Sequence, residues 1–259
     1  MIPTSTQAAR IGVDLAQAVA RISLRQPPLN IIDIGMMEEL ARVLAGIETR
    51  PDITAMVFCG AGKDFSAGVD VAAHTPDKVV EMLSKFHAVI RALVSTRKIT
   101  IAAVHGRCLG GGAELAMVCD MVYTTEDAQW GFPEIRLGCY PPVACAALAA
   151  LVGQKRAAEL ILTGHSISGK EAAEIGLATL ACPGDPSSAV EERLGQLRNL
   201  SPSALAITKK AFYSWDSIHL DKGLARAEKT YFEELMKTAD AEEGIRAFME
   251  KRPPRWTGR

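Results

Sequence analysis

Two glutamates lie twenty residues apart in surroundings that do not suit an ordinary surface carboxylate. Glu114 follows three glycines in the segment GRCLGGGAELAMVCD, and Glu134 lies between Pro133 and Ile135 in the segment AQWGFPEIRLG. A carboxylate among apolar residues is costly unless it is paired, protonated or used in catalysis. Two such groups near a glycine-rich helix start suggest an acid/base pair. Its substrate would develop a negative charge that backbone N–H groups stabilise.

Each of these features also has a purely structural explanation. The loop GAGKDFSAGVD lacks the P-loop pattern, and LGGGAEL lacks the dinucleotide fingerprint G-x-G-x-x-G. The glycines of the loop could serve a tight turn. The glycines of LGGGAEL could serve close helix–strand packing, or they could expose free N–H groups at a helix start. Glu114 could be a first-turn carboxylate favoured by the helix dipole, and Glu134 a surface loop carboxylate. The residues alone leave both explanations open.

The elements that must position these residues follow from hydrophobic periodicity. Apolar strands alternate with amphipathic helices, which predicts an α/β core. After about residue 187 the chain is expected to be nearly all helix. We therefore expect an α/β body over residues 1–186 and a helical segment over residues 187–259. The predicted strands are 13–24 (strand or hairpin), 54–59 and 99–104, and the predicted helices are 33–48, 77–95, one from near Gly111, 187–199, 202–215, 220–237 and 240–250.

Composition narrows the class of protein. The chain has 259 residues, a formal net charge of −1 and 48% hydrophobic residues, as in an ordinary globular protein. No global basic field is present, which argues against a nucleic-acid partner. The six cysteines include no C-x-x-C pair and the five histidines are scattered, so we expect reduced thiols and no metal site. No secretory signal or long apolar run is evident, so we expect a cytoplasmic protein without a membrane span.

Four segments carry a family resemblance. In chain order they are GKDFSAGVD (62–70), AAVHGRCLGGGAELAMVCD (102–120), WGFPEIRLG (130–138) and LTGHSISGKEAAEIGLA (162–178). They resemble the successive motifs of the enoyl-CoA hydratase/isomerase (crotonase) family, and the match runs from about residue 13 to the C-terminus. The resemblance implies a spiral of ββα repeats whose C-terminal helices pack around a homotrimer or a dimer of trimers. It also implies an acyl-CoA thioester substrate, with no cofactor beyond the CoA of the substrate.

The resemblance also implies roles for particular residues. The backbone N–H groups of Val69 and Gly111 would form an oxyanion hole for the thioester carbonyl. Having both Glu114 and Glu134 is the pattern of hydratases, which add water to a carbon–carbon double bond, whereas isomerases often keep one glutamate.

Four further residues concern the CoA part of the substrate. The backbone around Ala67 and Gly68 would contact its adenine end. Arg25 would lie near its phosphates, and Lys251 would reach the CoA of a neighbouring subunit. A solvated strand-end arginine and a solvated basic tail are equally good interpretations of these two cations.

One segment departs from the common family pattern. Straight-chain hydratases usually follow the second glutamate with a glycine-rich stretch, whereas this chain has CYPPVACAALAAL. Pro141 and Pro142 suit a rigid helix entry, and Tyr140 is expected to shape the acyl pocket. The combination GCYPPVA is more similar to hydratases that act on cyclic dienoyl-CoA esters in anaerobic aromatic degradation. There are three alternatives: a straight-chain hydratase with a neutral loop variant, a double-bond isomerase, and a non-catalytic CoA-binding oligomer. The third is less favoured, because binding alone does not require paired glutamates.

The predicted C-terminal helices carry apolar stripes that suggest contacts with other subunits. The residues of these stripes are Leu205, Ile207 and Phe212 in one helix and Leu224, Tyr231 and Leu235 in the next.

Overall fold

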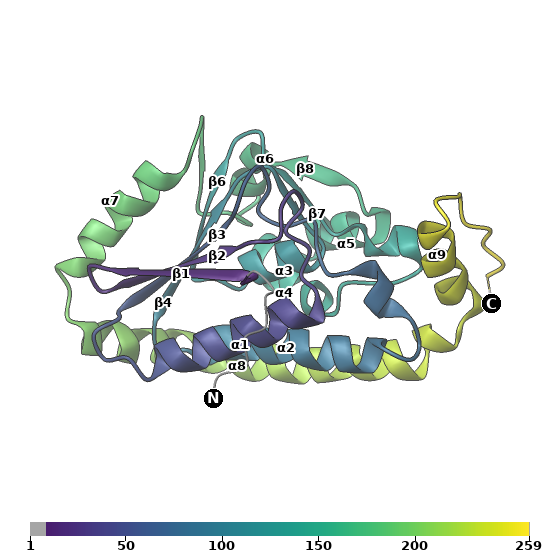
Figure 1. Cartoon of the computed structure of the whole chain (residues 1–259), viewed down its shortest axis with the longest axis horizontal. Helices are drawn as coiled ribbons and strands as arrows, with labels where there is room; N and C mark the ends of the chain where they lie inside the picture. The colour runs from purple at the N-terminus through teal and green to yellow at the C-terminus, as the bar shows by residue number, and fades with distance from the viewer. Residues whose placement is uncertain (1–8, 259) are drawn as a thin grey trace.

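A six-stranded sheet forms the frame of the protein (Figure 1). Its strands lie in the order β1-β2-β3-β4-β6-β9. The computed structural model describes residues 9–258, without the side chains of residues 214–219. The first two strands form an antiparallel hairpin, and every later pairing in this sheet is parallel. The strands are β1 (Ile11–Ala16), β2 (Val19–Leu24), β3 (Ala55–Gly60), β4 (Ile99–Val104), β6 (Met121–Thr125) and β9 (Leu180–Cys182).

A second, three-stranded sheet consists of β5 (Arg107–Leu109), β7 (Gln129–Gly131) and β8 (Ser166–Ser168). The chain alternates between the two sheets. After β4 in the large sheet it enters β5 in the small one and then a helix, and β6 and β7 repeat the same step. An isolated bridge between Ser66 and Cys108 adds the segment after β3 to the same pattern. This alternation is the predicted spiral of ββα repeats.

Most of the predicted helices begin and end close to the expected residues. Asp33 caps the first helix as expected, because its Oδ1 accepts a hydrogen bond from Met36 N (2.8 Å). Pro142 occupies the first turn of its helix, where a missing N–H costs nothing. The helices are α1 (Ile34–Glu48), α2 (Val79–Ser95), α3 (Gly111–Met117), α4 (Pro142–Val152), α5 (Gln154–Thr163), α6 (Gly169–Glu174), α7 (Ser187–Arg198), α8 (Pro202–Glu233) and α9 (Ala239–Met249), with 3-10 turns η1 (Val71–His74), η2 (Pro133–Leu137) and η3 (Leu235–Lys237).

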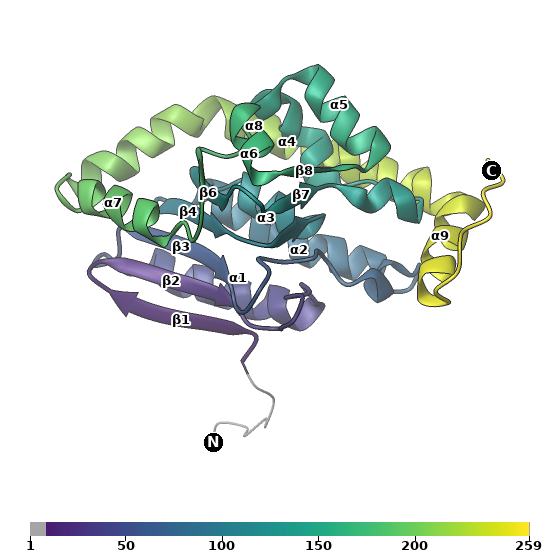
Figure 2. The ribbon, with the colours of Figure 1, turned by 90° about the horizontal axis from the view of Figure 1, so that it is seen from above.

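Helices cover both faces of the large sheet. On one face α1 packs on α2 and α2 packs on α8, and Figure 1 shows the three running along the same side of the molecule. On the other face α7 places Val190 and Leu194 against Val57 and Ile101 in a separate small core. Figure 2, seen from above, places α7 and α9 at opposite ends of the molecule. The larger core lies between the sheets and the helices α1 to α4.

The helical C-terminal segment is present, but one prediction within it is wrong. Residues 202–215 and 220–237 were expected to form two helices, whereas α8 is one helix of 32 residues followed by a short 3-10 turn. The sequence between 215 and 220 contains neither proline nor glycine, so no residue there ends a helix. Near its start, α8 is fixed to the sheet by Lys209, whose Nζ donates to Lys98 O (2.7 Å) and Asp120 Oδ2 (2.8 Å). Among the described residues, no helix is long and apolar enough to cross a membrane.

Candidate active site

The start of α3 is built from glycines that are needed for both conformation and space. Gly110 has φ 51° and ψ −128°, which a residue with a side chain rarely adopts. A Cβ at Gly110 would lie 2.7 Å from Glu134 Oε1, and a Cβ at Gly112 would lie 2.8 Å from Ser66 O. The glycine triplet therefore lets the loop before α2 and the turn that carries Glu134 approach the helix backbone. Close packing, the structural explanation of these glycines, applies to Gly112.

Two backbone amides come together at this helix start. Val69 and Gly111 were predicted as paired donors, and a Cβ at Gly111 would lie only 3.5 Å from Val69 N and 2.5 Å from Val69 Cγ2. The bridge beside Val69 uses other groups, since Ile32 N donates to Gly68 O (2.9 Å) and Asp70 N donates to Ile32 O (3.3 Å). Gly111 N belongs to the first helical turn, where an N–H has no partner within the helix. Both amides remain available as donors to a ligand oxygen.

Glu114 is held by a different helix from its own. Its side chain is 3% exposed, and its Oε1 accepts hydrogen bonds from Val143 N (2.8 Å) and Ala144 N (3.0 Å) in the first turn of α4. Burial raises the pKa of Glu114 to about 7, and the two amides act in the opposite direction. Glu114 therefore belongs to α3, but its carboxylate interacts with the N-terminus of α4, the helix that begins at Pro142.

Glu134 lies on the 3-10 turn η2, which starts at Pro133 and is closed by Gly138 with φ 68°. The residue is half-buried, and within residues 9–258 its buried Oε2 has no hydrogen-bond partner. Burial, followed by the neighbouring Glu114 charge, raises the pKa of Glu134 well above its ordinary value. Glu134 is thus no surface loop carboxylate. The two glutamates share one pocket but have different hydrogen-bonding environments.

The turn that carries Glu134 is backed by α9. A Cβ at Gly244 of α9 would lie 2.2 Å from Leu137 O, the last residue of η2, and a Cβ at Gly138 would lie 2.7 Å from Asp240 O. The backbones of η2 and α9 therefore touch directly, and glycine is required on both sides. A shift of α9 would move η2, and Glu134 with it.

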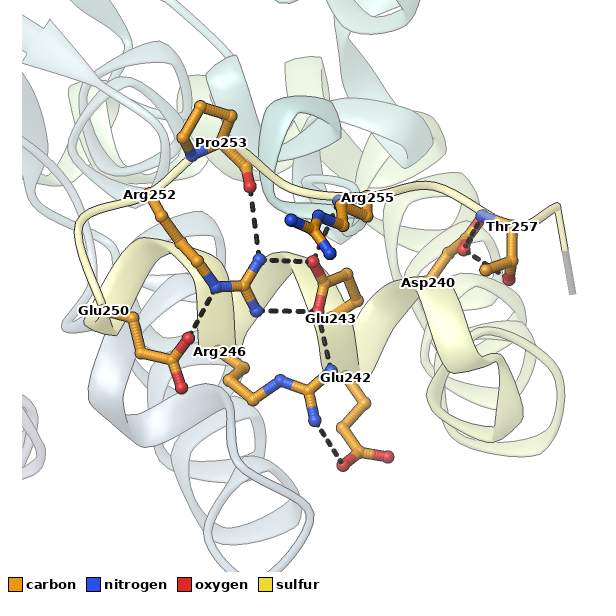
Figure 3. Close-up of polar contacts among 9 residues, drawn as sticks. All are labelled: Asp240, Glu242, Glu243, Arg246, Glu250, Arg252, Pro253, Arg255 and Thr257. Carbon is orange, nitrogen blue, oxygen red and sulfur yellow. Dashed lines mark hydrogen bonds and ion pairs between the residues drawn. The ribbon is translucent and has the colours of Figure 1, made fainter.

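The chain after α9 is tied back onto this helix by a polar cluster (Figure 3). Glu243 accepts from Arg252 through Nη1 (2.6 Å) and Nη2 (2.9 Å), from Arg246 Nη2 (2.7 Å) and from Arg255 N (2.8 Å). Asp240 accepts from Thr257 N (2.6 Å). These bonds lower the pKa of the Glu243 carboxyl, with Arg252 as the largest cause. The cluster fixes the end of the chain behind the element that carries Glu134.

One pocket brings most of the predicted site residues together. Its walls include the two glutamates, the two donor residues and Ala67, Gly68, Tyr140, Pro141 and Pro142, all of which the sequence had singled out. Tyr140 lines the pocket with its ring, while its hydroxyl donates to Ala227 O of α8 (2.7 Å). Sequence reasoning missed several apolar and aromatic lining residues, namely His74, Met82, Leu83, Phe86 and Tyr231.

The missed residues could not be assigned to a pocket from periodicity. Leu83 and Phe86 were recognised only as the apolar face of a helix. Tyr231 and Leu224 were expected to face another subunit, but both are 0% exposed within this single chain. The correction follows from packing, because α8 lies against α4 and buries these side chains inside the protomer. An apolar stripe reveals a buried face without revealing its neighbour.

Arg25 and Lys251 lie outside the pocket lining of this chain. Arg25, at the end of β2, donates from Nε to Ser23 Oγ (2.9 Å). Lys251 is exposed just after α9, with φ 54°. Their contacts with CoA remain predictions. Among the described residues, no group of three or more His, Cys, Asp or Glu side chains is placed to hold a metal ion.

The chain is similar to known proteins in both sequence and structure. The family model for enoyl-CoA hydratase/isomerase matches residues 14–259. A cyclohexa-1,5-dienecarbonyl-CoA hydratase of Thauera aromatica is 33% identical over 250 residues, covering 96% of this chain and 97% of the relative. A probable enoyl-CoA hydratase of Bacillus subtilis is 35% identical over 256 residues, covering 96% and 98%. A solved enoyl-CoA hydratase from Mycobacterium avium subsp. paratuberculosis has a TM-score of 0.86 at 26% identity and covers 97% of this chain and 100% of that one.

Proposed function

Because the chain belongs to the enoyl-CoA hydratase/isomerase family, we propose that it hydrates an unsaturated acyl-CoA thioester and that its preferred acyl group is a cyclic diene. The observation that supports hydration is the pair of carboxylates in one pocket, Glu114 buried and Glu134 half-buried, beside two backbone amides that have no backbone partner among the described residues. Hydration needs a base for water, an acid for carbon and a site for the transient negative charge on the thioester oxygen. This pocket offers all three.

The thioester oxygen binds the N–H groups of Val69 and Gly111. Water adds to the double bond as Glu114, the carboxyl with a pKa of about 7, accepts its proton. Glu134, whose pKa burial raises well above its ordinary value, carries the proton that is delivered to the neighbouring carbon. One O–H bond of water and the π bond of the substrate break, and one C–O bond and one C–H bond form, so no redox step is involved. A proton then passes from Glu114 to Glu134 and restores the starting state of the enzyme. The CoA part extends along Ala67 and Gly68.

The cations assigned to the CoA phosphates are Arg25 and the Lys251 of a neighbouring copy. Both are exposed side chains, so they can accept a phosphate without breaking a buried contact.

Three features favour a ring over a flexible chain. Pro141 and Pro142 restrict the backbone at one wall, and Tyr140 packs edge-on against Tyr231, with ring centroids 5.1 Å apart. A rigid wall suits a rigid substrate, since less ordering is needed on binding. The Thauera aromatica relative is itself named for a cyclic dienoyl-CoA. The expected reaction is reversible hydration of a cyclohexadiene-carbonyl-CoA to a hydroxycyclohexene-carbonyl-CoA.

The test is kcat/KM for cyclohexa-1,5-diene-1-carbonyl-CoA against kcat/KM for crotonyl-CoA. Absorbance reports the reaction, because hydration of crotonyl-CoA removes conjugation, isomerisation shifts it and binding alone leaves it unchanged. We expect the cyclic ester to be the better substrate. A tenfold advantage for crotonyl-CoA would instead make the protein a straight-chain hydratase, the activity in the name of the Bacillus subtilis relative.

We also propose a homotrimer or a dimer of trimers. Part of the apolar surface of α8 is still available for it, since Ile207 and Phe212 are 69% and 70% exposed. Light scattering at micromolar concentration is expected to give at least three times the chain mass of 27.7 kDa. A mass of one chain would contradict the proposal.

A further inference from the structure

Tyr231 occupies an unusual position in the pocket. It comes from α8, about a hundred residues after the two glutamates in the sequence, and its side chain is 0% exposed. Its ring meets the ring of Tyr140 edge-on, with an interplanar angle of 67°. The two tyrosines form one aromatic wall, and Glu134 lines the same pocket.

The hydroxyl of Tyr231 is buried and makes no hydrogen bond to an oxygen or nitrogen of any residue that the structure describes, and the Cys139 thiol lies beside it. Tyr140 differs, because its hydroxyl is bound to Ala227 O. The neighbouring Cys139 offers only a weak sulfur acceptor, and its own thiol hydrogen goes to Leu137 O (3.6 Å). A buried hydroxyl without a partner is unfavourable, and native proteins keep few of them outside functional sites.

Glu134 Oε2 is a second buried oxygen without a partner in this pocket. A phenol can donate one hydrogen bond, and a carboxyl oxygen can accept one. A single oxygen atom that accepts from Tyr231 and donates to Glu134 would satisfy both groups. Water and an alcohol have this capacity, whereas a hydrocarbon chain does not.

We infer that the Tyr231 hydroxyl donates a hydrogen bond to the oxygen that the reaction adds to the substrate. This inference rests on the proposed hydration. The reacting water has two hydrogens, which point to Glu114 and Glu134, and two lone pairs. Tyr231 binds one lone pair, so only the other can point to the carbon of the double bond. After the C–O bond has formed, Tyr231 keeps the same hydrogen bond to the product hydroxyl.

The surroundings keep the phenol in the form that this role needs. Burial raises the pKa of Tyr231, and Cys139 and Glu134 act in the same direction. The group therefore remains a neutral O–H donor when Glu114 and Glu134 exchange protons.

The test is Tyr231→Phe, which removes one oxygen and keeps the ring. We expect kcat/KM for hydration to fall ten- to a hundredfold. Affinity for 3-hydroxybutyryl-CoA and for hydroxycyclohexene-carbonyl-CoA is expected to fall by a similar factor. Affinity for butyryl-CoA and cyclohexene-carbonyl-CoA, which lack the added oxygen, is expected to stay within twofold. The melting temperature is expected to stay at or above that of the wild type, because the lost hydroxyl has no oxygen or nitrogen partner among the described residues.

Tyr123→Phe is the matched control. Tyr123 is also buried, but its hydroxyl accepts from Arg193 Nε (3.0 Å) in the small core near α7, away from the pocket. This variant is expected to keep full kcat/KM and to lose some thermal stability.

Two results would overturn the inference. Unchanged turnover and unchanged affinity for the hydroxyacyl esters in Tyr231→Phe would give the hydroxyl no part in the site. Equal losses of affinity for the esters with and without the hydroxyl would mean that Tyr231→Phe acts by changing the shape of the pocket, and not by removing a hydrogen bond. If the wild type hydrated no ester, the proposed function would fail, and the two pairs of affinities would still decide the role of Tyr231.

Discussion

The two carboxylates of the pocket are supported by different regions of the molecule. Glu114 lies on a helix inside the spiral, and two amides of α4 bind one of its oxygens. Glu134 lies on a single 3-10 turn, one of its oxygens has no partner among the described residues, and its backing comes from α9. Amides stabilise the charged form, and burial disfavours it. The comparison shows how identical side chains can differ in their support, because two amides favour the charged form of Glu114 and no such donor among the described residues binds Oε2 of Glu134.

The largest expected effect is loss of proton transfer. Glu114→Gln and Glu134→Gln are each expected to lower kcat/KM for hydration by at least about 10²-fold, because an amide cannot exchange a proton. Affinity for a saturated acyl-CoA, measured by calorimetry, should change little. Full activity in either variant would remove that carboxylate from the mechanism and end the comparison between the two.

The next effect concerns the amide pair beside Glu114. Gly111→Pro removes the N–H donor, and loss of one such donor typically lowers the rate by about 10²–10³. The proline also introduces a Cβ that would lie 2.5 Å from Val69 Cγ2. Gly111→Ala has the same clash but keeps the N–H, so it is the control. Turnover is expected to be lower in the proline variant than in the alanine variant by about a hundredfold. Equal rates in two folded variants would place the oxyanion hole elsewhere.

A third effect acts on Glu134 from a distance. Gly244→Ala would place a Cβ 2.2 Å from Leu137 O and push η2 away from its position. A small misplacement of a catalytic group can cost up to about 10²-fold in rate, so we expect kcat to fall about tenfold with little change in KM. Gly195→Ala on α7, where a Cβ would meet nothing within 4 Å, is the matched control. An equal loss of activity in both variants would contradict the support assigned to α9, and so would full activity in both.

The smallest effect is on stability as a function of pH. Glu114 has a folded pKa of about 7, above its ordinary value of 4.5, so the folded state holds a proton that the unfolded state has lost. Its contribution to the free energy of unfolding therefore falls as pH rises from 4.5 to about 7. Denaturant titrations at several pH values should show this slope in the wild type and a flatter one in Glu114→Gln.

Glu243 provides the opposite case for the same titrations. Its folded pKa lies below the ordinary 4.5, so the stability it contributes is present above that pH and is lost as pH falls below it. Glu243→Gln should change only the acidic side of the profile. A change confined to the acidic side in Glu114→Gln would show that its pKa is not raised in the folded state.

Local sequence patterns predicted the parts of the site that are built locally. The strand at 99–104, the helix start at Gly111 and the helix entry at Pro142 depend on neighbours within a few residues, and all three are confirmed. The donors that bind Glu114 come from α4, about thirty residues later, and no pattern around Glu114 contains them. Tyr231 and Gly244 depend on contacts across about a hundred residues. The sequence around these two residues shows an apolar stripe and a glycine, but it does not show which residues they contact.

The unbroken course of α8 decides where the chain can change in length. Two helices with a loop between them could accept an extra residue in that loop. In a continuous helix, one inserted residue turns everything after it by about 100° and moves it by about 1.5 Å along the axis. Lys209 fixes the first part of α8 to Asp120, and Tyr231 lies in the pocket near its end. Insertions between these two residues would therefore rotate Tyr231 out of the aromatic wall, so this stretch should vary in residue type but not in length.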